Sequence, residues 1–539
     1  MKKLISILLV LALVPAAFAG CGKKGEPSET AYVPTGDAII MDESDLATMP
    51  DEREPQSLTL AYDPSRSMNP LVGNNISNRA LFSLIYQGLF ATNSVNEPTP
   101  ILCSHYQVSS DNRSYTYYLD KNARFSDGSR VTGEDLMASL EFAWKTSPYY
   151  KGRFVQVLSI EPVREESLGE DGVKIFLNTA YQDFSMLMDV PILKAEELES
   201  EFPLGTGPYT FHVEESGAHM ERNKQWWCSV ETPARADRIS LVQVATQSEL
   251  RDAFEFGDVS LAVANPLSDS FAEYSCDYEL WNNENGYFLY LGVNIQYSDY
   301  FKDGKNKAVR QALTYAIDRD TIIENNFRGK AYAATLPASP GTLYYNDSLA
   351  EQYQYDDLKF LDAVSGFEPV KDDHQNIKKM RLLVNKDDSA RLRTARNIAA
   401  TLTNMGIPCG TLEYGTDTDY SYEDVLRSHN WDLYLGKTRL SANMDLSSFF
   451  KGYGNLWYGG LTNDEIYAMC RDTLADRGNY YNLHQMIADD GRIVPILFGY
   501  DAVYAKRGVF ENLQPSRDNV FYYTIGKTME GARIKTVYS

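Results

Sequence analysis

The residue types that most often carry out catalysis are scattered in this sequence. Its six histidines follow no motif, and no GxSxG, HExxH or P-loop pattern is present to place a nucleophile, a zinc ion or a phosphate. The segment GTG at 205–207 lacks the third glycine and the strand–helix context of a dinucleotide-binding loop. Asp318 and Asp320 could form a glycosidase-like carboxylate pair, but their place on or near a helix favours solvated or capping charges. We therefore expect a binding protein rather than an enzyme, with no catalytic residue, cofactor or metal ion.

The first 21 residues have the features of a secretory signal. Lys2 and Lys3 precede an apolar stretch at 4–18, which is too short for a comfortable membrane span and ends in small residues. The segment FAGC at 18–21 resembles a bacterial lipobox, in which cleavage precedes the cysteine and the thiol becomes lipid-modified. The resemblance implies a signal peptide at 1–20 and lipidation at Cys21. Plain secretion and a retained membrane anchor are the alternatives.

Composition restricts the partners that the chain could have. Its 539 residues are 43% hydrophobic and 12% aromatic, which is enough material for large cores and the length of three or four domains. With 74 acidic and 51 basic residues, the formal net charge of −23 argues against nucleic acid as a partner. Residues 22–54 are polar, acidic and rich in proline and glycine, so we expect residues 21–54 to form a flexible lipidated tether.

Five cysteines follow Cys21, and this odd number cannot pair completely. None of them lies in a CxxC motif. An exported protein can form disulfides, but the sequence does not choose a pairing. We expect most of these cysteines to be buried as small apolar residues.

Hydrophobic periodicity predicts an alternation of strands and helices along the body of the chain. Strands are predicted at 57–62, 114–119, 172–178, 286–295, 380–384, from 407, 431–436 and 493–498, and helices at 76–90, after 132, 306–325, 389–405 and near 420–428. Thr132 and Asp135 form a capping-box pattern. Residues 306–325 have the cleanest helical spacing and predict one continuous helix. The strand–helix order between 380 and 436 indicates an α/β domain with parallel pairing.

Short motifs in a fixed order then suggest a family. They are YQGL at 86–89, PTPIL at 98–102, SYTYYLDKNARFSDGSRVTGEDLMASLEFAW at 114–144, GTGPY at 205–209, KAVRQALTYAIDRDTII at 307–323, MGI at 405–407, WDL at 431–433 and VPILF at 494–498. In this order, residues 57–530 resemble the extracellular solute-binding proteins of peptide-class ABC importers, the oligopeptide- and dipeptide-binding family 5.

The resemblance implies an α/β, two-lobed periplasmic-binding-protein-like fold with an extra inserted domain, and so three domains. Carried onto this sequence, the boundaries are 55–95, 203–290 and 495–539 for domain I, 96–202 for domain II and 291–494 for domain III. The GTGPY segment, with its two glycines and a proline, then marks the return from domain II. Two lobes that close on a solute can bury more of it than either could alone.

In peptide-binding members of this family, an acidic residue in the loop after the strand at 431–436 pairs with the α-amino group of the ligand. Here the equivalent position is Ala442, and Asp445 matches a second acid three residues on. A buried ammonium without a carboxylate is costly. Either Asp445 replaces the missing acid through a loop shift, or the solute is not held by a free amino terminus. Asp445 could equally cap the helix expected to start near Leu446.

Other candidate ligand-binding residues lie where the resemblance places the cleft. Arg439 could pair with a carboxylate. Trp281 could form an aromatic floor, and the amides of Asn282 and Asn283 could bond a peptide backbone. Further candidates are Trp457, Tyr500 and Asn74. For each of them, a role in the core or at the rim competes with a role in binding.

The favoured interpretation is a lipid-anchored, monomeric receptor at the extracellular face of the bacterial cell membrane, or in the periplasm. Its expected partners are a peptide or other small solute, the permease subunits of an ABC transporter and the membrane surface. One alternative keeps the receptor but changes the solute to an oligosaccharide or an opine-like compound. A secreted hydrolase or a surface adhesin is the other.

Overall fold

The computed structural model describes residues 58–165, 169–228, 235–268, 270–452, 455–510 and 513–523. The chain divides into two units, 1–54 and 55–539, and all described residues belong to the second. The predicted signal peptide, the tether and Cys21 lie outside the described residues. Within the described part, no helix is long and apolar enough to cross a bilayer.

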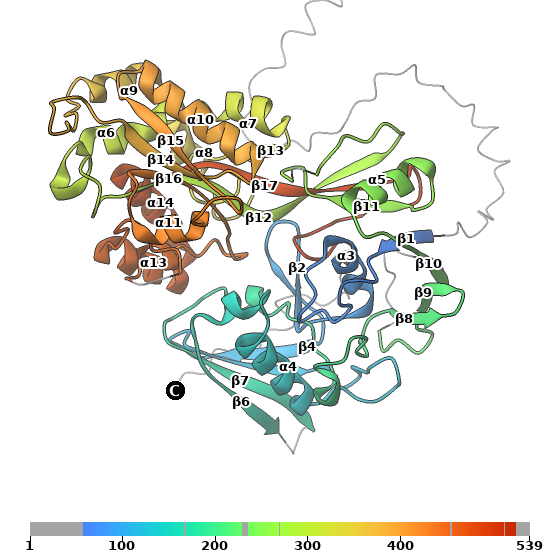
Figure 1. The fold of residues 1–539 in the computed structure, drawn as a ribbon. Coiled ribbons are helices and arrows are strands. Elements are labelled where there is room, and N and C mark those ends of the chain that lie inside the picture. Colours follow the sequence, from blue (N-terminus) through green and yellow to red (C-terminus); the bar gives the residue numbers. More distant parts are fainter. Residues whose placement is uncertain are drawn as a thin grey trace, which may run out of the picture. The chain divides into compact units, whose positions relative to one another are not determined.

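One four-stranded sheet brings distant segments together (Figure 1). Its order is β1 (Leu58–Tyr62), β10 (Arg238–Gln243), β9 (Gly217–Arg222) and β8 (Tyr209–Glu214), and β1 runs parallel to β10. Helix α3 (Ile76–Ile85) begins where the Asn75 side chain accepts hydrogen bonds from two backbone amides. The predicted strand at 57–62 and the start of the helix at 76 are thus confirmed.

A second four-stranded sheet is antiparallel throughout. Its order is β4 (Cys103–Val108), β5 (Ser114–Leu119), β7 (Glu170–Leu177) and β6 (Val157–Glu165). Helix α4 (Gly133–Lys145) lies against β6 and β7 (Figure 1). The capping box predicted for Thr132 and Asp135 is present at its start. A short pair, β2 (Phe90–Thr92) with β3 (Pro98–Pro100), is separate from these sheets.

The largest sheet has seven strands. Its order is β11 (Leu261–Ala264), β17 (Ile493–Ala505), β12 (Glu279–Val293), β16 (Leu433–Arg439), β14 (Met380–Asn385) and β15 (Cys409–Tyr414), and β13 (Ala331–Ala333) pairs with β17. β14 is parallel to both β15 and β16, which confirms the predicted parallel pairing. Helix α10 (Ser389–Asn404) packs on β14 and β15.

The single helix predicted at 306–325 is wrong. The segment forms α6 (Lys307–Ala312), a 3-10 turn at Leu313–Ala316 and α7 (Arg319–Phe327). Asp318 starts α7 by accepting a hydrogen bond from the Thr321 amide. The buried Arg319 guanidinium bonds the carbonyls of Thr314 and Ile317, so the broken turn keeps its polar groups satisfied.

The remaining α-helices are α5 (Gln247–Phe256), α8 (Asp347–Ala350), α9 (Asp357–Val364), α11 (Tyr422–Ser428), α12 (Ser447–Phe450), α13 (Asp464–Ala475) and α14 (Tyr480–Asp490). Further 3-10 turns are Lys151–Phe154, Phe184–Leu187, Ala195–Glu197, Lys302–Gly304, Glu351–Tyr353 and Arg477–Asn479. The five described cysteines form no disulfide with one another, and Cys103, Cys409 and Cys470 are buried.

Candidate functional site

A cavity of about 290 Å³ lies beside β11, the middle of β12, β17 and the start of α3. Charged side chains of both signs line it: Arg79, Arg439, Arg517, Asp501 and Asp518. Amide side chains from several elements join them: Asn74, Gln247, Asn265, Asn283 and Asn285. Such a lining suits a small solute that carries charges and hydrogen-bonding groups.

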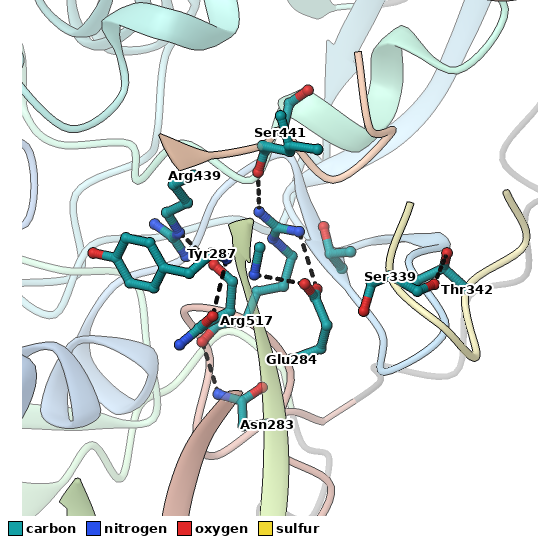
Figure 2. A network of polar contacts seen from close by, with 12 residues as sticks. Asn283, Glu284, Tyr287, Ser339, Thr342, Arg439, Ser441 and Arg517 are labelled. Carbon is teal, nitrogen blue, oxygen red and sulfur yellow. Dashed lines mark hydrogen bonds and ion pairs between the residues drawn. The ribbon is translucent and has the colours of Figure 1, made fainter. Parts of the chain in front are cut away.

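β12 presents alternate residues to this cavity. Asn283, Asn285 and Tyr287 line it, as the two-residue period of a strand requires. Asn283 is only 2% exposed; its Nδ2 donates to the Arg517 carbonyl at 2.8 Å, while its Oδ1 has no hydrogen-bond partner (Figure 2). A buried acceptor left open on a cavity wall is a site for a ligand donor.

Asp518 is the centre of a cluster of arginines. Its carboxylate lies 2.7 Å from Arg439, 3.2 Å from Arg153 and 3.6 Å from Arg79, and it also accepts from the Tyr149 hydroxyl. Burial opposes ionisation, but the guanidinium groups hold the pKa of Asp518 well below its usual range. Arg439 is therefore already paired inside the protein, and its Nε also donates to the Asn285 carbonyl at 2.6 Å.

Arg517 forms a second ion pair at the cavity wall. It lies 3.1 Å from Glu284 and donates to the Leu440 carbonyl at 2.7 Å (Figure 2). Gly286 permits this contact: its φ is 76°, it lies at an irregularity in the β12–β17 register, and a Cβ there would be 2.6 Å from Arg517 Nη2.

Asp501 stands directly across from Asn283 in the β12–β17 pairing. Its Oδ1 accepts from Asn285 Nδ2 at 3.0 Å. Burial raises the pKa of Asp501 to about 6, against the opposing effects of the Asn285 hydrogen bond and of Arg439. It is a carboxyl group that changes its charge close to neutral pH.

Three of the residues predicted from sequence, Asn74, Asn283 and Arg439, line this cavity. The other five do not. Asn282 is exposed on the opposite face of β12 from Asn283. Three others take part in packing: Trp281 against a cluster of buried hydrophobic side chains, Trp457 beside His429, and Tyr500 against Tyr332.

Asp445 has local partners. Its carboxylate accepts from the Ser447 amide at 2.8 Å and from the Ser447 hydroxyl at 3.0 Å, at the start of α12. These bonds lie one residue before Leu446, the N-cap of α12, which has no side-chain cap of its own. Burial raises the pKa of Asp445, and the bonds to Ser447 counter that rise. Ala442, which the sequence resemblance aligns with the family's acid, is buried.

Sequence reasoning missed Arg79, Asp501, Arg517 and Asp518 as site residues. Of the two neighbouring amides that it named, Asn283 lines the cavity and Asn282 does not. The available signal was the strand alternation of β12, which places 283, 285 and 287 on one face. No pattern marked Asp518, because it lies in an irregular segment. Among the described residues, no group of three or more histidine, cysteine or acidic side chains could hold a metal ion.

Comparison with known proteins gives a family match. Residues 97–457 match the model for "Bacterial extracellular solute-binding proteins, family 5 Middle". The glutathione-binding protein GsiB of Escherichia coli (strain K12) is 24% identical over 310 residues, which is 54% of this chain and 57% of the relative. The chain thus spans about half the length of the curated relatives it matches.

Solved structures share the fold. The ABC transporter substrate binding protein CtaP from Listeria monocytogenes has a TM-score of 0.68 at 19% identity, with 86% of this chain and 97% of that chain covered. NikZ from Campylobacter jejuni, in complex with Ni(L-His), has a TM-score of 0.60 at 16% identity, with 86% and 96% covered. The predicted α/β, two-lobed periplasmic-binding-protein-like fold is confirmed, whereas the domain boundaries stay a prediction.

Proposed function

Because the chain belongs to the bacterial extracellular solute-binding proteins, family 5, we propose that it is a lipid-anchored receptor that captures short peptide-like solutes and delivers them to an ABC transporter permease. The permease and the membrane surface are its proposed partners, and a monomer outside the cell membrane is its proposed state. The FAGC segment at 18–21 supports the anchor.

The observation that carries this proposal is the composition of the cavity wall. A short peptide has charges of both signs at its ends and alternating donors and acceptors between them. The cavity offers arginine and aspartate side chains together with five amides. Its volume of about 290 Å³ is at the lower end of ligand pockets, roughly 300–1,000 Å³, which favours a solute of a few residues.

The test is to identify what the protein binds. Mass spectrometry of the solute that copurifies with it should find a short peptide or peptide-like compound. Calorimetric titration with pools of two- to five-residue peptides should show saturable binding by the emptied protein. If no pool of any length binds to protein that circular dichroism shows to be folded, the peptide part of the proposal is wrong.

A second candidate is the same receptor role for a non-peptide solute, such as an oligosaccharide or an opine-like compound. Ala442 favours it, because the acid that holds a peptide amino terminus in the family is missing there. NikZ, of similar fold, is in complex with Ni(L-His). Asp445→Asn distinguishes the two: peptide affinity should collapse if Asp445 replaces the missing acid, and non-peptide binding should barely change.

A further inference from the structure

The charged side chains that line the cavity differ in whether they have an ion-pair partner. Arg79 and Arg439 pair with Asp518, and Arg517 pairs with Glu284. Asp501 has no lysine, arginine or histidine nitrogen within 4.0 Å among the residues that the structure describes, and its hydrogen bond comes from the neutral Asn285. It is the cavity-lining acid for which the protein supplies no cation at contact distance.

The surroundings of Asp501 offer acceptors rather than donors. Asn285 occupies Oδ1, and within the described part of the chain nothing donates to Oδ2. Across the strand pair, Asn283 contributes its open Oδ1 from a side chain that is 2% exposed. Directly paired residues on one face of a sheet have side chains within contact range, with Cβ atoms about 5 Å apart. Two open acceptors, one of them anionic, match a group that has only donors.

We propose that Asp501, together with Asn283, binds the primary ammonium group of the solute, so that β17 and β12 supply the cation subsite that the loop at Ala442 lacks. An α-ammonium and a side-chain ammonium share this chemistry. The inference depends on the proposed receptor function in one respect: a solute must bind in this cavity. It does not require that the solute be a peptide.

Proton linkage predicts how binding at this subsite depends on pH. The charged groups that face Asp501 are Arg439 from β16, Asp518 from the segment 513–523 and Glu284 from β12; Arg439 favours its ionised form, and the two acids oppose it. A cation binds the ionised form. With a pKa of about 6, only about a tenth of the Asp501 carboxyl groups are ionised at pH 5. The affinity for a primary ammonium group should therefore be about tenfold lower at pH 5 than at pH 7.5. Binding at pH 6 should release about half a proton.

The experiment compares a pool of primary amines, consisting of tripeptides and α,ω-diamines, with the same pool after acetylation. Equilibrium dialysis of the full chain followed by mass spectrometry ranks the members. Calorimetry in two buffers of different ionisation enthalpy then counts the protons released. We expect the free amines to bind at least about tenfold more tightly than their acetylated forms. Lysine-free peptides in the pool distinguish an α-ammonium from a side-chain ammonium.

Two variants with the same chemical change make the result specific. Asp501→Asn keeps an acceptor for Asn285 and should remove both the amine preference and the pH dependence. Asp373→Asn, at an exposed acid away from the cavity, should leave both unchanged. Thermal denaturation checks that each variant is folded.

The outcomes separate the two proposals. If peptides bind without any amine preference, or if Asp501→Asn retains that preference, the subsite is wrong although the receptor function stands. If diamines bind in an Asp501-dependent way and no peptide does, the subsite stands and the peptide proposal fails. If nothing binds to the folded protein, both are wrong.

Discussion

At the scale of single residues, Asp518 neutralises side chains that lie far apart in the sequence. Arg79, Arg153 and Arg439 all contact its carboxylate, and the four side chains are largely buried. Asp518→Asn would remove the carboxylate that pairs with Arg79 and Arg439, while Arg153 keeps its ion pair with Asp189. Since breaking a buried pair costs roughly 3–5 kcal/mol, we expect the free energy of unfolding to fall by about 3 kcal/mol or more in urea titrations. Asp373→Asn, at an exposed position, should change it by less than about 0.5 kcal/mol.

The difference in free energy of unfolding between the native protein and Asp518→Asn should also vary with pH. The folded pKa of Asp518 is depressed, so its contribution is fully present above the unfolded value of about 3.9 and is lost as the pH falls below it. The gap between the native protein and Asp518→Asn should therefore narrow between pH 5 and pH 3. A gap that stays constant over this range would show that Asp518 acts through packing alone.

At the scale of elements, two strands that border the cavity are longer in the structure than the sequence predicts. β12 was predicted from 286 and begins at Glu279; β17 was predicted to 498 and continues to Ala505. Asn283, Asn285 and Asp501 lie in these extensions and line the cavity. The extension of β12, residues 279–285, is mostly polar and lacks the hydrophobic alternation by which strands are found. Sequence reasoning therefore missed Asn285, and it also missed Asp501, the one charged residue in the mostly apolar extension of β17.

The helix break at 317 has a related cause. The apolar spacing of 306–325 continues across the break, while the signal for a new helix is the local pair Asp318 and Arg319. Asp318 caps α7, and Arg319 donates to carbonyls as distant as Ala334 and Pro495. Those partners come from other elements, so periodicity within the helix could not reveal them.

The GTGPY segment allows a test at the element scale. The Gly205 carbonyl accepts from the Ser126 amide at 2.9 Å, and a Cβ at Gly205 would overlap the Ile85 carbonyl at the end of α3. Gly205→Ala should therefore destabilise the protein by about 1–3 kcal/mol, as overpacking does. Gly152→Ala is the matched control, because a Cβ there meets no atom within 4 Å. Equal midpoints of thermal unfolding for the two variants would contradict the explanation.

At the scale of the whole molecule, the proposed lipid anchor is a property of Cys21. Cys21→Ser removes the thiol that would carry the lipid, so we expect the protein to move from the membrane fraction to the soluble exported fraction, and incorporation of labelled fatty acid to be lost. Cys276→Ser, in the body of the chain, is the control and should stay with the membrane. Membrane association that survives Cys21→Ser would contradict lipidation at this residue.

Most of the charged residues that line the cavity lie outside the segment that matches the family model. The family model matches residues 97–457, yet Arg79, Asp501, Arg517 and Asp518 lie outside that span. Two homologues could therefore have very similar sequences over the matched segment and still bind different solutes. Cargo inferred from the matched segment alone would disregard most of the charges in the cavity. Comparisons that classify these receptors by their solutes should therefore include the segments around residues 79, 501 and 518 as well.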